Sequence, residues 1–260
     1  MNCNDFKFYT EDGFDPRDHL ETYYSDRPDM VFGDDSLVFP IENLKKLFSG
    51  GNLKGDVLID LSCGSIIPQL YAVSEFYKCI LALRIRYTDI MEMKRWLDTR
   101  TGAFGWRHAT KICLGEDADS DQLQNKEEEI RSIMHHVVKC DLECENIMDP
   151  MVLPLADCII SAWLLEYVCK DQDDFKKSLK KFSKLLKPGG QFIYIGNLDA
   201  TYAIIGEDKL KTFTYNEDFV RKALTEAGFV IDDCKVKKRT NMSVLTDYKA
   251  VICIAAHKEE

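Results

Sequence analysis

Three features that mark common classes of protein are missing from the sequence: a C-x-x-C motif, a long apolar segment and an excess of basic residues. Its ten cysteines form no C-x-x-C, so the usual thiol redox and zinc spacings are missing. No apolar run approaches the length that crosses a bilayer, and no leading segment joins a positive start to an apolar core. Lys and Arg number 34 against 44 Asp and Glu, a net charge of −10, which argues against a nucleic-acid or anionic-membrane surface. We therefore expect a cytoplasmic protein, with no nucleic-acid or membrane partner.

Length and composition favour a single folded domain. The 260 residues suffice for one large α/β domain and are short for two. We expect one domain over 1–260, in which residues 1–50 form an N-terminal helical cap or lid and 51–260 form the core. The early aromatic residues could equally pack on the domain or close over a ligand. The scattered cysteines, several inside apolar strands, predict buried reduced thiols and not disulfides or metal ligands.

Residues 56–70, D-V-L-I-D-L-S-C-G-S-I-I-P-Q-L, are the most informative stretch. Residues 57–61 are apolar apart from one aspartate, which predicts a strand buried on both faces of a parallel sheet. The small residues 62–65 predict a turn in which Gly64 can adopt a positive φ, and a helix should start near Pro68. This arrangement can aim helix amides at a ligand, but a single glycine is also compatible with an ordinary turn between a strand and a helix.

Strands and helices then alternate along the chain. Apolar runs predict strands at 57–61, 79–84, 137–142, 156–165, 191–196, 229–236 and 248–257, and periodic segments predict helices from Asp15 and Pro16, at 35–48, 66–77, 89–98, 122–136, from Asp171 or Asp173 to Leu186, and at 216–227. Alternation predicts a doubly wound, mainly parallel sheet of seven strands. The last two strands have no helix between them, so the closing strand should be antiparallel to its neighbour.

Several phrases together resemble a known family. The first strand and its turn, L-L-K-P-G-G before Q-F-I-Y-I, and E-A-G-F look like a class I S-adenosylmethionine-dependent methyltransferase with a Rossmann-like fold. A narrower set, D-P-R-D-H-L-E-T-Y-Y, G-D-V-L-I-D, W-L-D-T-R-T-G-A-F-G-W, K-E-E-E-I-R, V-V-K-C-D, V-L-P-L-A-D-C and Y-A-I-I-G-E, is similar in order to the nicotinamide, indolethylamine and phenylethanolamine N-methyltransferases. The resemblance covers nearly the whole chain.

The resemblance implies S-adenosylmethionine as methyl donor and a small amine or pyridine-type nitrogen as acceptor, in an enzyme that we expect to be a monomer without a metal. Residues implied for the cofactor, from its amino-acid end to its adenine, are Tyr23, Tyr24, Ser62, Cys63, Gly64, Asp89, Asp141 and Leu142. Plain packing for the two tyrosines and a helix cap for Asp141 are the competing interpretations. A nucleophilic role for Cys63 is disfavoured because no histidine is near it in sequence.

The chain departs from the family pattern around the cofactor. The turn is S-C-G-S in place of G-S-G-P, Pro68 replaces a tyrosine, and His19 stands where a tyrosine is usual. At the end of the second strand Arg84 replaces an acid that accepts bonds from the ribose hydroxyls. A guanidinium has no acceptor, so the loss should weaken cofactor binding by about ten to a hundredfold, unless Asp89 compensates.

The acceptor positions differ too. Gly196 matches the aspartate of the nicotinamide-methylating members and Thr212 matches a serine, which argues against nicotinamide as the favoured acceptor. Glu166 and Asp199 are the acids left to hold an amine and accept its proton, and Tyr202 could line the pocket. Each of them could equally be a surface or packing residue.

Two other functions remain open from the sequence. The combined departures are also what a family member that has lost catalysis, and serves in binding or regulation, would carry. Arg84 could instead mark a phosphorylated dinucleotide, because an arginine at this place accepts a 2′-phosphate. The single-glycine turn and the antiparallel last strand speak against the dinucleotide.

Overall fold

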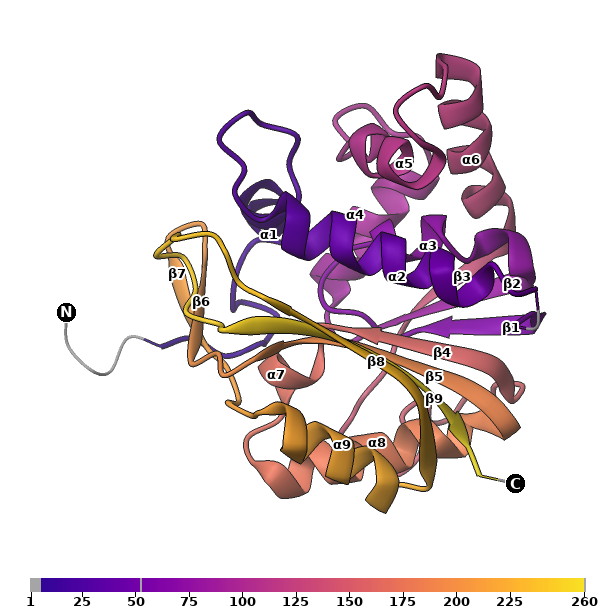
Figure 1. Cartoon of the computed structure of the whole chain (residues 1–260), viewed down its shortest axis with the longest axis vertical. Helices are drawn as coiled ribbons and strands as arrows, with labels where there is room; N and C mark the ends of the chain where they lie inside the picture. The colour runs from indigo at the N-terminus through magenta and orange to yellow at the C-terminus, as the bar shows by residue number, and fades with distance from the viewer. Residues whose placement is uncertain (1–5, 52, 260) are drawn as a thin grey trace.

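The computed structural model describes residues 6–51 and 53–259, and its centre is a seven-stranded sheet (Figure 1). The strands lie in the order β3-β2-β1-β4-β5-β9-β8. Their bounds are β1 Gly55–Asp60, β2 Tyr77–Arg84, β3 Met134–Lys139, β4 Ala156–Ala162, β5 Leu186–Leu198, β8 Phe229–Lys238 and β9 Ala250–Lys258. The first five are parallel to one another, and β9 is antiparallel to both β5 and β8. The predicted sheet, with its antiparallel last strand, is confirmed.

Helices cover both faces of this sheet, as the predicted doubly wound architecture requires (Figure 1). One face carries α1 Pro16–Tyr23, the π-helical turn η1 Asp34–Val38, α2 Phe39–Phe48, α3 Pro68–Tyr71, α4 Tyr87–Leu97, α5 Arg107–Leu114 and α6 Ser120–Ile133, with the 3₁₀ turn η2 Ser74–Phe76 leading into β2. The other face carries α7 Leu165–Val168, α8 Gln172–Leu185 and α9 Glu217–Glu226. The central strands are therefore shielded from water on both sides.

Burial on both faces explains why the central strands read as apolar runs. Leu58 and Ile59 of β1 and residues 158–160 of β4 are fully buried. At about 25 cal/mol per Å² of apolar surface, such side chains each stabilise the fold by about 1.5–3 kcal/mol. Asp60 is the polar exception in β1 and is also fully buried.

Local capping chemistry sets two helix starts. The Asp15 carboxylate accepts a hydrogen bond from the Arg17 amide at 2.7 Å, and Pro16 is the first helical residue, as predicted. Asp171 caps α8 by accepting from the amides of Asp173 and Asp174, both at 2.9 Å. Of the two candidates that the sequence left open, Asp171 is therefore the cap.

The structure differs from the prediction in three connecting segments. The helix after β1 starts at Pro68 but is one turn long, where the sequence predicted a helix over 66–77. The polar segment 197–215 contains a hairpin of β6 Tyr202–Ile205 and β7 Asp208–Lys211, turned at Gly206 with φ 58°. The insert 99–121 contains α5, whose start has no side-chain cap and so left no signal in the sequence.

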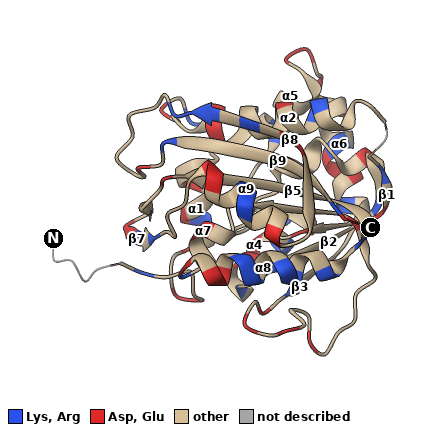
Figure 2. Cartoon of the chain, turned by 60° about the horizontal axis from the view of Figure 1, so that its bottom comes forward, with Lys and Arg blue, Asp and Glu red and all other residues tan. Residues whose placement is uncertain are grey.

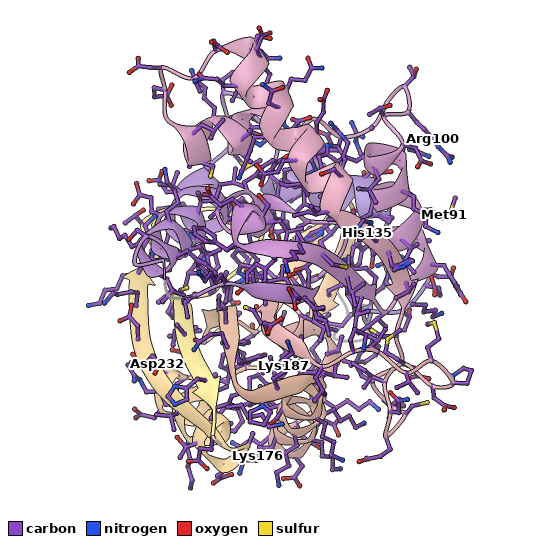
Figure 3. All side chains as sticks on the ribbon, turned by 90° about the vertical axis from the view of Figure 1, so that its right-hand side faces the viewer. Met91, Arg100, His135, Lys176, Lys187 and Asp232 are labelled. Carbon is purple, nitrogen blue, oxygen red and sulfur yellow. The ribbon has the colours of Figure 1, made fainter. Side chains whose placement is uncertain are left out.

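The C-terminal strands pair as their short link requires. β9 lies between β5 and β8, so the last strand is inserted into the sheet and β8 forms its edge. Figure 3 labels Asp232 on this outer strand, where its carboxylate lies 2.8 Å from Nδ1 of His257 on β9. Arg239 stabilises the connection between β8 and β9, residues 239–249, by donating to the carbonyl of Thr246 at 2.7 Å.

The surface carries both signs of charge (Figure 2). The lysines of α8 are partly paired with acids of neighbouring elements; Lys176, for example, lies 2.7 Å from Glu226 of α9. Nine cysteines in the described part of the chain are free, and six of these are buried, as the sequence predicted. Within residues 6–51 and 53–259 no helix is long and apolar enough to span a bilayer.

Candidate functional site

The turn after β1 lies at the carboxyl edge of the sheet, at the level where β4 ends. The Cys63 amide donates to the carbonyl of Ala162 at 2.8 Å, which holds the turn against β4. Gly64 has φ 59°, a conformation that L residues rarely adopt, and a Cβ there would meet Nδ1 of His19 at 2.6 Å. Burial raises the pKa of the Cys63 thiol well above its usual value, so this cysteine is protonated and unsuited to nucleophilic attack.

Arg84, the largest departure from the family pattern, is paired inside the protein. Its Nη2 lies 2.5 Å from Oδ2 of Asp60, and both side chains are fully buried. Arg84 also donates to the carbonyls of Asp60 and Ile66. The remaining Asp60 oxygen accepts from Ser62 Oγ at 2.6 Å and Gln69 Nε2 at 2.9 Å. Asp60 therefore neutralises Arg84 beneath the turn, and Arg84 adds no unpaired cation there.

A second buried pair follows β2. Arg86 Nε lies 3.3 Å from Oδ2 of Asp89, and both side chains are almost fully buried. The same Asp89 oxygen accepts from the Tyr9 hydroxyl at 2.8 Å, and that hydroxyl in turn accepts from the Gly64 amide at 2.7 Å. Burial raises the pKa of Asp89, and the Arg86 charge and the Tyr9 bond oppose that rise. Asp89 thus lies beside the turn, where the sequence expected the ribose contact.

Tyr9, which donates to Asp89, also lines a cavity of about 550 Å³. It is lined by Asp141 and Leu142 after β3 and by Ile85 after β2, and it is closed on the other side by Tyr9 and Tyr167. Thr212 also lines it. The Asp141 carboxylate accepts from the Glu143 amide at 2.9 Å, a local turn that fixes the carboxylate at the cavity wall. Residues from three strand ends therefore meet at one hollow.

A smaller cavity of about 40 Å³ lies under α1 and η1. It is mainly aromatic, and its lining includes Tyr23, Tyr24, Phe32, Trp163, Tyr167, Tyr248 and the carboxylate of Asp35. Asp35 is occupied by its neighbours, since its Oδ2 accepts from Tyr248 at 2.5 Å and Lys237 Nζ lies 2.7 Å from its Oδ1. Tyr167 lines both cavities and stands between them.

His19 connects the smaller cavity to the turn. It is buried, and desolvation lowers the pKa of its imidazole to about 3, so the ring is neutral. Its Nδ1 faces Gly64. A neutral ring places no extra positive charge beside the turn.

Glu166 and Asp199, the two acids predicted to hold the acceptor, lie in different environments. Glu166 in α7 is buried; its Oε1 accepts from the Asn197 amide at 3.1 Å, and desolvation raises the pKa of the carboxyl to about 8. Asp199 is exposed and lines neither cavity. Tyr202 also lines neither cavity and donates to the carbonyl of Val244 at 3.1 Å.

Unpartnered buried polar atoms cluster around the turn. Among the described residues, the buried side-chain atoms without a hydrogen-bond partner include His19 Nδ1, Ser65 Oγ, Gln69 Oε1, Arg84 Nε, Arg86 Nη1, Asp89 Oδ1, Glu166 Oε2 and Thr212 Oγ1. Native proteins pair nearly all such atoms with protein groups, ordered water or ligands, so these atoms are candidates for contacts with a polar ligand. The donors and acceptors present suit the hydroxyls and the amino-acid group of an adenosyl ligand.

Sequence reasoning missed Tyr9, Arg86 and the pairing of Asp60. Tyr9 lies among several aromatic residues, and no spacing singles it out. A signal existed for the pairing: Asp60 is the sole polar residue of its apolar run, and a buried acid needs a cation.

The fold and the site define a class I methyltransferase architecture. The structure of a magnesium protoporphyrin IX methyltransferase from Synechocystis with bound SAM matches with a TM-score of 0.59 at 13% identity, covering 96% of this chain and 95% of that one. A SAM-dependent methyltransferase from Clostridium acetobutylicum matches with a TM-score of 0.53 at 15% identity, covering 88% and 97%. Identities this low compare folds only.

Sequence comparison narrows the class to one family. The NNMT/PNMT/TEMT family profile matches residues 5–259, and the chain belongs to that family. Indolethylamine N-methyltransferase of Oryctolagus cuniculus is 31% identical over 95% of this chain and 94% of its own length. Nicotinamide N-methyltransferase of Homo sapiens is 30% identical over 94% and 93%. The predicted family is confirmed, and with it the class of S-adenosylmethionine-dependent methyltransferase.

Proposed function

We propose that this chain transfers a methyl group from S-adenosylmethionine to the nitrogen of a small amine or aromatic base. The observation that carries the proposal is the cluster of unpartnered buried polar atoms around Gly64, directly between a larger cavity at Asp141 and a smaller aromatic cavity at Tyr24. A donor that is adenosine at one end and an amino acid at the other fits the larger cavity and the polar turn, which leaves the smaller cavity for the acceptor.

Each end of the cofactor has residues suited to it. Asp141 and the backbone of Leu142 would hold the adenine in the larger cavity, and Thr212 Oγ offers a free hydroxyl there. Asp89, whose Oδ1 is free, would accept from a ribose hydroxyl in place of the acid that Arg84 replaces. Ser62, Cys63 and Gly64 would approach the amino-acid end from the turn, with Tyr23 and Tyr24 above it.

The smaller cavity would take the acceptor. Its aromatic walls suit a flat ring or a cationic amine, since ring faces attract cations, and an acceptor of that size would have to widen the present volume of about 40 Å³. When bound, the cofactor supplies the activated methyl group; the chain's own residues align the acceptor nitrogen with it and exclude water.

An aliphatic amine has to lose a proton before it can attack. Glu166 is the carboxyl that we propose as base, because it is buried beside Asn197, which lines the smaller cavity, and its pKa of about 8 lets it exchange a proton near neutral pH. A pyridine nitrogen needs no base. Asp199 and Tyr202 receive no role in this proposal, because Asp199 is exposed and the Tyr202 hydroxyl already donates to the carbonyl of Val244.

A labelled-methyl assay tests the proposal directly. The purified full chain is incubated with radiolabelled S-adenosylmethionine and a panel of pyridines, arylalkylamines and thioethers. We expect label in at least one amine or pyridine product. Binding of S-adenosylhomocysteine without transfer to any acceptor would identify a non-catalytic family member, and absence of both would refute the cofactor site.

The same experiment separates two acceptor classes. If the acceptor is an aliphatic amine, Glu166→Gln should lower kcat and flatten its rise with pH; if it is a pyridine, the pH profile should not change. We further expect a monomer, and size-exclusion chromatography with light scattering measures this.

A further inference from the structure

An N-terminal strap, residues 7–14, crosses the carboxyl edge of the sheet and is fastened at both ends. At its start, the Lys7 amide donates to the carbonyl of Lys209 at 2.8 Å, and the Lys211 amide donates to the carbonyl of Lys7 at 3.2 Å. At its end, Arg86 donates to the carbonyl of Phe14 at 2.8 Å and stacks 3.9 Å from the centre of the Phe14 ring. These contacts hold the strap across the candidate cofactor site.

The side chain in the middle of the strap uses groups that a ligand would need. The Tyr9 hydroxyl accepts a hydrogen bond from the Gly64 amide and donates one to the Asp89 carboxylate. Tyr9 is only 8% exposed, so water does not compete with these bonds. One donor and one acceptor of the site are therefore satisfied by the chain itself.

Tyr9 also lines the larger cavity and packs beside the residue that the two cavities share. Its ring centre is 6.0 Å from that of Tyr167, which lines both. Ser62 and Cys63 of the turn are also buried. An extended adenosyl ligand that reaches from Asp141 to the Gly64 amide and to Asp89 meets the Tyr9 side chain, which already binds both groups.

We propose that Tyr9 is an intramolecular competitor of the cofactor: in the free protein it occupies the Gly64 and Asp89 contacts, and the cofactor binds by displacing it with the strap. This inference rests on the proposed function. The strap thereby sets the apparent cofactor affinity, because the competent state is only the fraction in which Tyr9 has left.

A second contact holds the strap outside the site. The Glu11 carboxylate accepts from the Tyr87 amide at 3.0 Å and lies 2.8 Å from Lys139 Nζ. Glu11 lines neither cavity, so weakening this contact should free the strap without removing a group from the site. Glu11→Gln is therefore an independent test of the same competition.

The experiment is calorimetry of S-adenosylhomocysteine binding to the full chain. Because Tyr9→Phe removes two hydrogen bonds that favour the closed state, one of them to a carboxylate, we expect about tenfold tighter binding. Glu11→Gln should tighten binding by a few-fold. Tyr202→Phe, which removes a tyrosine hydroxyl away from both cavities, is the matched control and should leave the affinity unchanged.

The outcomes separate this inference from the proposed function. If Tyr9→Phe binds more weakly than the wild type, the tyrosine is a ligand of the cofactor and the inference is wrong. If the wild type, Tyr9→Phe and Glu11→Gln bind equally, there is no competition, although the proposed cofactor site stands. If none of the variants nor the wild type binds, the proposed function is wrong and the inference falls with it.

Discussion

The buried pair between Arg84 and Asp60 should be a strong determinant of stability. Replacing Arg84 with methionine keeps most of the side-chain volume and removes the charge that Nη2 places 2.5 Å from Asp60 Oδ2. Asp60 would keep its bonds from Ser62 and Gln69 but remain buried without a counter-charge. Removing one partner of a buried pair costs about 3–5 kcal/mol. For 260 residues, 4 kcal/mol corresponds to a fall in Tm of about 7 °C.

A double variant distinguishes charge from packing. Arg84→Met combined with Asp60→Asn removes both charges and retains an amide oxygen for Ser62 and Gln69. We expect it to recover at least ~2 kcal/mol relative to Arg84→Met alone, since neutralised pairs are tolerated well. Arg84→Asp should be less stable than Arg84→Met, because it places a second buried carboxylate next to that of Asp60.

Urea unfolding at pH 7, followed by fluorescence, measures these differences. Arg100→Met is the matched control: Arg100 lies 2.6 Å from Asp98 on the surface, with both side chains about half exposed, and should lose less than about 1 kcal/mol. A loss below 1 kcal/mol for Arg84→Met, or no recovery in the double variant, would refute the reasoning.

Three further predictions concern the turn, the buried acid and the larger cavity. Gly64→Ala should destabilise the fold more than Gly102→Ala, because both have positive φ but only the Cβ at Gly64 meets another atom, at 2.6 Å; thermal unfolding compares the two, and equal losses would contradict the close approach. Glu166, with its pKa raised to about 8 by burial, binds a proton in the folded state that the unfolded state releases near pH 4.5, so its contribution to stability falls by up to ~1.4 kcal/mol per pH unit between about 4.5 and 8. Urea titrations of Glu166→Gln should lack that part of the slope, while Glu143→Gln on the surface should keep it; identical slopes in the wild type and Glu166→Gln would exclude the role of burial. Asp141→Ala should weaken S-adenosylhomocysteine binding about tenfold by calorimetry, whereas Glu145→Gln, outside the cavity, should not; an unchanged affinity for Asp141→Ala would remove the adenine from the larger cavity.

Much of the fold could be predicted because strong local signals agreed with one another. Apolar runs such as residues 57–61 had to be buried on both faces, and the Asp15–Pro16 and Asp171 caps fixed helix starts. The segments that were missed carry weak signals. The hairpin at 202–211 has short, half-polar strands that are held by distant segments, namely the strap, α1 and the chain at 245–246, and α5 starts without a cap.

The site was harder to predict, because it depends on which side chain pairs with which. The sequence placed Asp89, Asp141 and Leu142 at strand ends, and the structure brings them to one edge of the sheet. From the sequence, Arg84 was a departure beside the ligand with no visible partner. Its partner Asp60 is 24 residues away and becomes a neighbour only when β1 pairs with β2. Buried Arg84 leaves no guanidinium for a 2′-phosphate, so the dinucleotide alternative loses its support.

The most direct test is a crystal structure of the full chain with S-adenosylhomocysteine. The account predicts the adenine beside Asp141 and Leu142, the ribose at Asp89, the amino-acid end at Gly64, and Tyr9 withdrawn from its present contacts. Density for the ligand elsewhere, or none at saturating concentration with the protein folded, would contradict it.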